Sequence, residues 1–285
     1  MPKYSVIFCG TPDFAVPALK ALIDHPDFIV DLVITQPDKP VGRSQTITPP
    51  PVKIAAKETS IPVIQPEDIN KEFPKGTEAD FIITVAYGQI LDDEILKLPK
   101  IAPVNIHASL LPRWRGASPI QHTILEDETG GVTIQKMVKK LDRGPVLAQK
   151  EIKLDERETS TTLHDKLSVI GADLLIETLK STLKPKDQDE SKAVSCKKLT
   201  RKDGKVDPKK MTAREIDRHV RALVPWPGVR CTLNGHELKL IETSLTETKG
   251  SIQLTCKDDT ILHIVSLQPP GKRIMTGEQW ECGHK

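Results

Sequence analysis

The sequence predicts an α/β fold, with a doubly wound and mostly parallel sheet followed by a smaller antiparallel β-barrel domain. Short apolar runs alternate with helical patterns from residue 4 to residue 125, which is typical of a parallel sheet with helices on its faces. From Gly131 the apolar residues recur at every second position, which indicates half-exposed strands. Near the end of the chain, the same alternation is interrupted by the turn pairs Asn234-Gly235 and Asp258-Asp259, which favours a small barrel.

The best boundary between the two expected domains lies at residues 184–196. From Lys184 to Lys192 the side chains are charged, polar or proline, and a segment with nothing to bury stays solvated. A chain of 285 residues is long enough for two domains with separate cores. We therefore expect one domain at 1–183, a linker at 184–196 and a basic barrel domain at 197–285.

The first expected domain begins with a βα unit. An apolar strand at 4–9 and a turn at 10–13 precede Phe14, Ala18 and Leu22, which recur at helical spacing. The same reasoning predicts strands at 29–35, 61–64, 81–86, 104–107, 132–138 and 146–152, helices at 52–59, 90–98, 118–125 and 160–183, and a long loop at 36–51. The alternation of these elements is the basis for the predicted parallel sheet.

The second expected domain begins with a strongly basic run at 197–210. A capping box of Thr212 and Glu215 then starts a helix, which Pro225 stops. Helical spacing places three arginines on one face, which either phosphates or solvent can cover: Arg214, Arg218 and Arg221.

Composition limits the class of protein. The five cysteines lie far apart without a CxxC pair, which argues against a disulfide framework or a zinc knuckle and indicates reduced thiols in a cytoplasmic protein. The first ten residues lack the apolar core and cleavage site of a signal peptide, and no run approaches membrane-spanning length. We therefore expect no association with a membrane.

The charge is distributed unevenly along the chain. Residues 191–285 contain 18 Lys and Arg against 11 Asp and Glu, whereas residues 1–190 contain 23 against 28. A basic C-terminal part suits a polyanion such as a nucleic acid. A lysine-rich solubilising surface explains the same numbers, and charge alone does not decide between the two.

The polar pair Asn105 and His107 ends an apolar strand and is the strongest candidate for a reaction centre. Residues two apart on a strand point to the same face, and ligands of such sheets bind beyond the carboxyl ends of the strands. A neutral histidine can move protons near pH 7, and an amide can donate to a developing oxyanion. Asp142, in a loop bounded by Gly144 and Pro145, is the best candidate for a carboxylate that orients the imidazole. A hydrogen-bonded core histidine is the alternative.

The turn Ser109-Leu110-Leu111-Pro112 follows the polar pair and is too apolar for a solvated loop. It either plugs the core or forms a wall for a flat aromatic ligand. Arg113 and Arg115 can hold a carboxylate or phosphate, but exposed arginines need no ligand. The sequence contains neither a GxGxxG motif nor a P-loop, and its histidines have no metal-ligand spacing. We therefore expect no dinucleotide, ATP or metal site.

The stretch from Asn105 to Gln121 resembles the signature of the methionyl-tRNA formyltransferase family. These enzymes move a formyl group from 10-formyltetrahydrofolate to the α-amine of methionyl initiator tRNA. The motif itself fits any folate-dependent formyltransferase or formyl-folate hydrolase, whereas the segment 266–272 and the basic barrel are similar to the tRNA enzymes. Other similar segments lie at 10–19, 35–43, 85–88 and 131–134. The resemblance implies a Rossmann-like catalytic domain and an OB-like barrel that binds tRNA.

The resemblance also implies roles for individual residues. Asn105, His107 and Asp142 would be the catalytic trio, acting without a metal, and Ser109, Leu110, Leu111 and Pro112 would be part of the folate site. The cations expected to meet tRNA are Lys39, Arg43, Lys197, Lys198, Arg201, Lys202 and Lys205. The protein would act as a cytoplasmic monomer in translation initiation. The sequence departs from the family pattern at Lys140, where relatives have glycine, and in the loop 36–51, which is less basic than in relatives.

Two other functions remain open at this point. A formyltransferase that acts on a small amine, such as an amino sugar nucleotide or glycinamide ribonucleotide, would share the motif but would not need a basic barrel. A tRNA-binding protein with a decayed enzyme domain would keep the barrel, but retention of Asn105, His107 and Asp142 together argues against decay.

Overall fold

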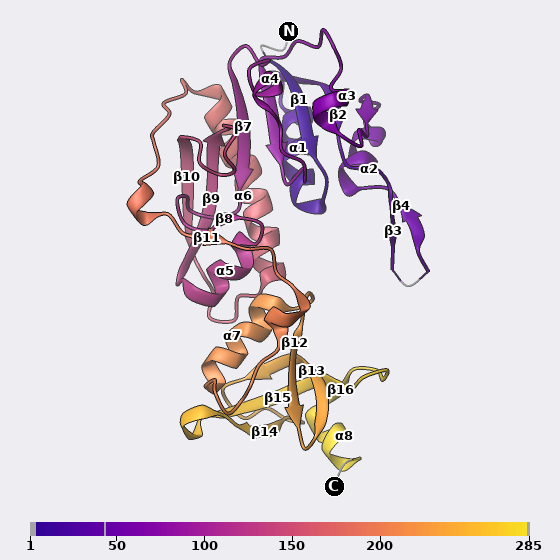
Figure 1. Cartoon of the computed structure of the whole chain (residues 1–285), viewed down its shortest axis with the longest axis vertical. Helices are drawn as coiled ribbons and strands as arrows, with labels where there is room; N and C mark the ends of the chain where they lie inside the picture. Colours follow the sequence, from indigo (N-terminus) through magenta and orange to yellow (C-terminus); the bar gives the residue numbers. More distant parts are fainter. Residues whose placement is uncertain (1–3, 43, 284–285) are drawn as a thin grey trace. The chain divides into compact units, whose positions relative to one another are not determined.

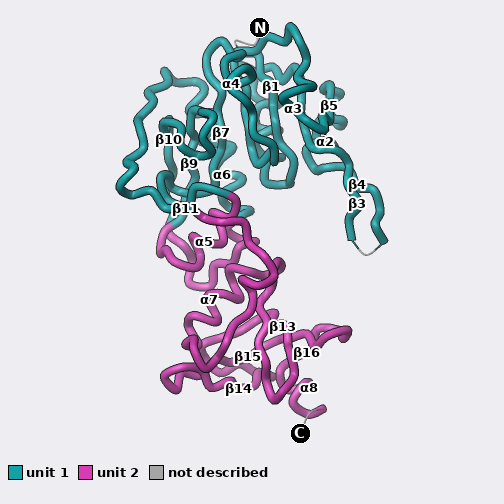
Figure 2. Tube along the Cα trace, in the orientation of Figure 1, with its two compact units in different colours: residues 1–116, 130–152, 164–195 teal, residues 117–129, 153–163, 196–285 magenta. Residues whose placement is uncertain are grey.

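The computed structural model describes residues 4–42 and 44–283, so Arg43, one of the expected tRNA-binding residues, lies outside the described part. The chain forms two compact units (Figures 1 and 2). Unit 1 comprises residues 1–116, 130–152 and 164–195, and unit 2 comprises 117–129, 153–163 and 196–285.

Unit 1 is built on a seven-stranded sheet with the order β10-β9-β7-β6-β1-β2-β5. Its strands are β1 (Tyr4–Gly10), β2 (Phe28–Ile34), β5 (Val63–Ile64), β6 (Phe81–Val85), β7 (Ala102–His107), β9 (Thr129–Lys136) and β10 (Val146–Lys153). The strands from β5 to β7 pair in parallel, whereas β9 runs antiparallel to β7. The prediction of a mostly parallel, doubly wound sheet is therefore confirmed.

The helices that accompany this sheet lie near the predicted positions, except for the short helix at Ile69–Glu72, which the sequence did not predict. They are α1 (Val16–Asp24), α2 (Pro51–Glu58), α3 (Ile69–Glu72), α4 (Asp93–Leu96) and α6 (Ser160–Lys180), with the 3-10 turn η1 (Asp13–Ala15) before α1. Side-chain caps start the short ones, since Asp68 accepts from the N–H of Asn70 and Asp92 accepts from those of Glu94 and Ile95.

The two faces of the sheet have different partners near β7. Gly171 of α6 lies so close to the Ile106 and Val132 side chains that a Cβ there would approach Ile106 to 3.0 Å. Ile106 therefore points toward α6, and Asn105 and His107 point to the opposite face. That opposite face carries an apolar cluster around Ile7, Cys9, Ile34 and Ile82. At its carboxyl edge, the cluster gives way to polar side chains.

Unit 2 contains α5 (Pro119–Glu126), α7 (Ala213–Leu223) and an antiparallel sheet with the order β12-β13-β15-β14, in which β16 also pairs with β15. Its strands are β12 (Val229–Leu233), β13 (His236–Ser244), β14 (Ile252–Thr255), β15 (Ile261–Gln268) and β16 (Met275–Thr276), followed by α8 (Gly277–Cys282). The predicted capping box of α7 is present, with Thr212 and Glu215 bonding reciprocally. The expected C-terminal domain of antiparallel strands is confirmed.

Two segments differ from the expectation. The loop at 36–51 contains a hairpin of β3 (Lys39–Val41) and β4 (Thr46–Thr48), which its prolines and glycine concealed. Residues 184–195 are not a free linker, because Lys186 exchanges two backbone hydrogen bonds with Val146 and Gln188 binds the loop that follows β9. Polar side chains and backbone groups hold this segment to the rest of unit 1.

Short elements complete the described fold. They are β8 (Arg115–Gly116), β11 (Ser195–Cys196) and the 3-10 turns η2 (Glu190–Lys192), η3 (Arg201–Gly204) and η4 (Lys257–Asp259). None of the helices in the described ranges combines the length and the hydropathy needed to cross a bilayer.

Candidate functional site

The end of β7 places Asn105 and His107 on one face at the carboxyl edge of the sheet, as the sequence predicted. Their neighbours in register are also polar, since Thr84 on β6 and Gln135 on β9 lie opposite Asn105, and Thr133 lies opposite His107. Residues that lie opposite each other on paired strands point to the same face of the sheet. A row of polar side chains therefore crosses three strands where an open sheet of this type binds its ligand.

His107 is buried and lies between two oxygen acceptors. Its Nε2 is 3.0 Å from the backbone oxygen of Trp114, and its Nδ1 is 3.5 Å from Oδ1 of Asp142. A carbonyl oxygen can only accept, so Nε2 carries the hydrogen in this contact. The structure thus brings the predicted histidine and carboxylate together, although they are 35 positions apart in the chain.

Asp142 is held by its own backbone conformation and by three neighbours. Its φ of 53° lies in the left-handed region, which aspartate tolerates better than most residues. Oδ2 accepts from the N–H of Gly116 at 2.8 Å, and Oδ1 accepts from Nε2 of Gln135 at 3.2 Å. Nε2 of Gln188 donates to the carbonyl oxygen of Asp142 itself. The carboxylate therefore has a fixed orientation beside the imidazole.

Close backbone packing fixes the loop around Asp142. A Cβ on Gly144 would lie 1.7 Å from the carbonyl oxygen of Lys136, so only glycine fits at this position. Gln188 also donates to the Gly144 carbonyl at 2.7 Å. Lys140, which replaces the family glycine, lies exposed in this loop, and Asp142 still reaches inward.

The apolar turn at 109–112 is anchored by the side chains of Thr133 and Gln149. The Thr133 hydroxyl donates to the carbonyl of Ser109 at 2.6 Å and accepts from the N–H of Leu111 at 3.0 Å. Nε2 of Gln149 donates both to that hydroxyl and to the carbonyl of Leu111. Leu110 packs on Gly131, where a Cβ would approach its Cδ2 to 2.5 Å. The turn is therefore a rigid wall next to His107.

Several buried polar atoms of unit 1 have unused hydrogen-bonding capacity. Within the described residues, no partner is present for the Thr84 hydroxyl, the Tyr87 hydroxyl, Oε1 of Gln135 or Nε2 of Gln36. No hydrogen bond reaches the Asn105 side-chain amide from the same described part of the chain. Burial raises the pKa of the Tyr87 phenol, so it remains a neutral donor. Unsatisfied buried polar atoms of this kind are expected where a polar ligand binds.

Sequence reasoning missed the supporting residues Gln135, Thr133, Gln149 and Gln188. Period-two alternation placed Gln135 and Thr133 on one face of a strand, but the pairing of that strand with β7 could not be deduced from sequence. Gln188 lay inside the expected solvated linker. In each case the sequence did not reveal which distant segments of the chain pair with one another.

The cations expected to meet tRNA belong to other elements than the polar row at the end of β7. Lys39 is exposed on the β3–β4 hairpin of unit 1. The other expected cations lie in unit 2 and are all exposed: Lys197, Lys198, Arg201, Lys202 and Lys205. Lys197 forms an ion pair with Asp203 at 2.9 Å, whereas none of the other four has a carboxylate partner among the residues described.

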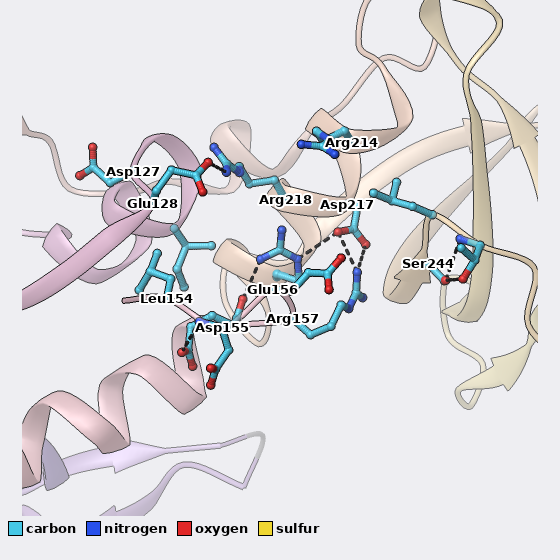
Figure 3. A pocket seen from close by; sticks show the side chains of 15 residues that line it. Asp127, Glu128, Leu154, Asp155, Glu156, Arg157, Arg214, Asp217, Arg218 and Ser244 are labelled. Carbon is cyan, nitrogen blue, oxygen red and sulfur yellow. Dashed lines mark hydrogen bonds and ion pairs between the residues drawn. The ribbon is translucent and has the colours of Figure 1, made fainter. Parts of the chain in front are cut away.

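A cavity of about 270 Å³ lies in unit 2 beside α7 (Figure 3). Asp217 is buried there and accepts from Arg157, Arg221 and the Thr243 hydroxyl at 2.9 to 3.0 Å. Arg218 donates to Glu128 and to a backbone carbonyl. Arg218 and Arg221, two of the three arginines expected on one face of this helix, therefore form ion pairs within the unit rather than contacts with phosphates. The cavity carries more carboxylates than arginines along its lining.

Comparison with known proteins identifies the family. The model of the family described as "Formyl transferase" matches residues 3–179, and that of "Formyl transferase, C-terminal domain" matches 198–285. The methionyl-tRNA formyltransferase of Bacillus velezensis is 41% identical over 98% of this chain and 94% of its own length. The chain belongs to the methionyl-tRNA formyltransferase family. The family that the motif predicted is thereby confirmed.

Other members of the methionyl-tRNA formyltransferase family match equally fully. The Bacillus subtilis enzyme is 40% identical over 98% of this chain and 94% of its own length, and the Staphylococcus aureus enzyme is 38% identical over 98% and 96%. Among solved structures, the fold resembles an N-formyltransferase of Helicobacter canadensis, solved with folinic acid and dTDP-3-aminofucose (TM-score 0.69, 19% identity, 93% of this chain and 99% of that chain). It also resembles a methionyl-tRNA formyltransferase from Clostridium thermocellum (TM-score 0.58, 16% identity, 96% and 99%).

Proposed function

We propose that this chain transfers the formyl group of 10-formyltetrahydrofolate to the α-amino group of methionyl initiator tRNA. The observation that carries the proposal is the convergence of His107 and Asp142 beside Asn105 at the carboxyl edge of a formyltransferase sheet. The relatives that cover nearly the whole chain at about 40% identity are named for the same acceptor.

The residues at this edge suit a folate donor. Leu110, Leu111 and Pro112 offer an apolar wall for a flat pterin, held rigid by Thr133. The unsatisfied hydroxyl of Thr84 and Oε1 of Gln135, which lie in register with Asn105, offer polar partners to ring nitrogens and the amide. Folate or a formyl-folate analogue is present in two structures of similar fold. The proposed donor site is the wall with these polar atoms.

The proposed chemistry is direct attack of the neutral amine on the formyl carbon. A C–N bond forms to the amine, the bond from the formyl carbon to the folate nitrogen breaks, and one proton passes from the amine to the departing nitrogen. The free amide of Asn105 donates to the oxyanion of the tetrahedral intermediate. His107 supplies a second donor, the N–H at Nε2. This group must first exchange its hydrogen bond to the Trp114 carbonyl for one to the substrate. Asp142 orients the imidazole and assists the proton transfer.

In the proposed division of work, residues 1–183 bind folate and perform the chemistry, and residues 197–285 bind tRNA. Lys39 and Arg43 would meet the RNA from the loop 36–51. The cysteines of the described residues are all free thiols, which suits a cytoplasmic enzyme. The protein would act as a monomer.

The decisive experiment is a formyl-transfer assay with labelled 10-formyltetrahydrofolate and methionyl initiator tRNA. Elongator methionyl-tRNA, free methionine and a dTDP-amino sugar serve as alternative acceptors. Label is expected on the initiator methionyl-tRNA far more rapidly than on any of the others. Equal or faster transfer to the sugar or to free methionine would overturn the proposed acceptor while leaving the formyltransferase family intact.

A further inference from the structure

Trp226 is an exposed tryptophan in the turn that follows α7 of unit 2. Its exposed fraction is 52%, whereas the other two tryptophans, Trp114 and Trp280, are 3% and 2% exposed. A large aromatic side chain left in solvent forgoes the burial that usually stabilises it. The proposed chemistry does not use this residue.

The turn that carries Trp226 is packed into the unit rather than frayed. The N–H of Gly228 donates to the carbonyl of Leu223 at 2.8 Å, and Pro227 and Gly228 are buried. A Cβ on Gly204 would lie 1.9 Å from the Gly228 oxygen, so the 3-10 turn η3 lies directly against this backbone. The indole is therefore held outward by an anchored segment.

Cations surround this turn. Nζ of Lys239 is 3.4 Å from the carbonyl oxygen of Pro225, and a guanidinium nitrogen of Arg230 is 3.4 Å from that of Pro227. Lys205 lies beside Arg230 through a backbone bridge. Arg201 and Lys202 lie on η3 itself.

These five cations are available to an external anion. Throughout residues 4–42 and 44–283, none of them forms an ion pair with a carboxylate. The nearest acid in sequence, Asp203, is engaged by Lys197 and Thr200, which hold its pKa well below the usual range. The surface around Trp226 therefore combines an exposed aromatic plane with uncompensated positive charge.

We propose that Trp226 stacks on an unpaired base of the RNA substrate while the five cations hold the flanking phosphates. Aromatic side chains beside a basic groove are the usual means by which proteins grip unpaired nucleotides. An apolar peptide would use the indole but would leave the cations without partners. The inference rests on the proposed function, because it names a base contact for the same tRNA.

The direct test uses the emission of the full-length protein. Because the other two tryptophans are buried, the part of the signal that acrylamide quenches reports Trp226. Initiator tRNA and a six-nucleotide oligo(A) should quench that part, whereas heparin, a polyanion without bases, should bind without quenching it. Trp226→Phe should abolish the signal while keeping the affinity, since phenylalanine also stacks.

Substitution supplies a second readout. Trp226→Ala should weaken oligo(A) and tRNA binding by about 5- to 150-fold, the loss of one base–aromatic stack, and should raise KM for tRNA without lowering kcat. Lys239→Met keeps the stem over Gly228 and should flatten the salt dependence of binding. Ile261→Ala, another exposed apolar residue of unit 2, is the matched control and should change neither.

The outcomes separate this inference from the proposed function. If the wild-type protein formylates initiator methionyl-tRNA but saturating tRNA leaves the Trp226 emission unchanged, the stacking inference fails and the function stands. Absence of oligo(A) binding, or equal affinity in Trp226→Ala and wild type, overturns the inference as well. Absence of formylation with intact quenching overturns the function alone.

Discussion

The backbone N–H of Gly116 donates to Oδ2 of Asp142 at 2.8 Å. Gly116 belongs to the same stretch of chain that begins at Asn105, so the start of the stretch supplies the reactive side chains and a later residue orients their carboxylate. Oδ1 of Asp142 is thereby left facing Nδ1 of His107 at 3.5 Å. The end of the strand and the loop that follows it are therefore linked through Asp142.

Removing either member of this pair should abolish most of the turnover. Asp142→Asn preserves the shape and tolerates the positive φ, and His107→Ala removes the imidazole. We expect kcat to fall roughly a hundred- to ten-thousandfold in each, with tRNA affinity nearly unchanged, as measured by formyl-transfer kinetics and filter binding. Near-wild-type turnover in both variants would remove the proposed mechanism.

Asn105→Ala should lower kcat by about a hundred- to a thousandfold, because one donor to the oxyanion is lost. KM should change little, since the amide has no hydrogen bond to the described protein in the absence of substrate. The thermal midpoint is the control measurement and should stay near that of the wild type. A loss that appears in KM alone would assign Asn105 to ground-state binding instead.

Gly144→Ala should both destabilise the protein and impair turnover. The added Cβ would lie 1.7 Å from the Lys136 carbonyl oxygen, so the loop must shift and take Asp142 with it. The expected cost is about 1–3 kcal/mol of unfolding free energy. The control is Gly283→Ala, where the nearest atom is 3.7 Å away; its effect should be within about 0.5 kcal/mol.

Alkaline pH should destabilise the protein partly through Cys9. Burial raises the pKa of this thiol from 9.0 to about 12, so above pH 9 the unfolded chain loses a proton that the folded state retains. Cys9 therefore makes its full contribution to the free energy of unfolding below pH 9. The contribution falls as the pH rises toward 12, by about 1.4 kcal/mol per pH unit for one group. Cys9→Ala should flatten that slope in denaturant titrations, and Cys282→Ala, at an exposed position, should leave it unchanged.

Binding of tRNA should weaken steeply with salt, because phosphates dominate such affinity. Lys202→Ala should reduce the slope of log K against log salt by somewhat less than about one unit. Lys20→Ala, which removes an exposed lysine of unit 1, should leave the slope as it is. An affinity insensitive to salt would contradict an electrostatic grip by unit 2.

Local sequence patterns predicted much of the fold and the Asn105–His107 pair of the site. Alternation placed Asn105 and His107 on one face, and the apolar runs located β1, β2, β6 and β7 to within two residues. Gln135 and Gln188 were missed because their roles depend on which strand pairs with β7 and on where a polar segment attaches. The hairpin β3–β4 was missed because its strands are short, exposed and rich in turn residues.

Gln188 gives residues 184–195, the last segment of unit 1, a second property. Its side chain holds the carbonyls of both Asp142 and Gly144, so a pull on residues 184–195 strong enough to break these bonds would release the loop that carries the carboxylate. The last segment of unit 1 is thus also a brace for the reaction centre, because one side chain fixes both carbonyls of the loop that carries the carboxylate.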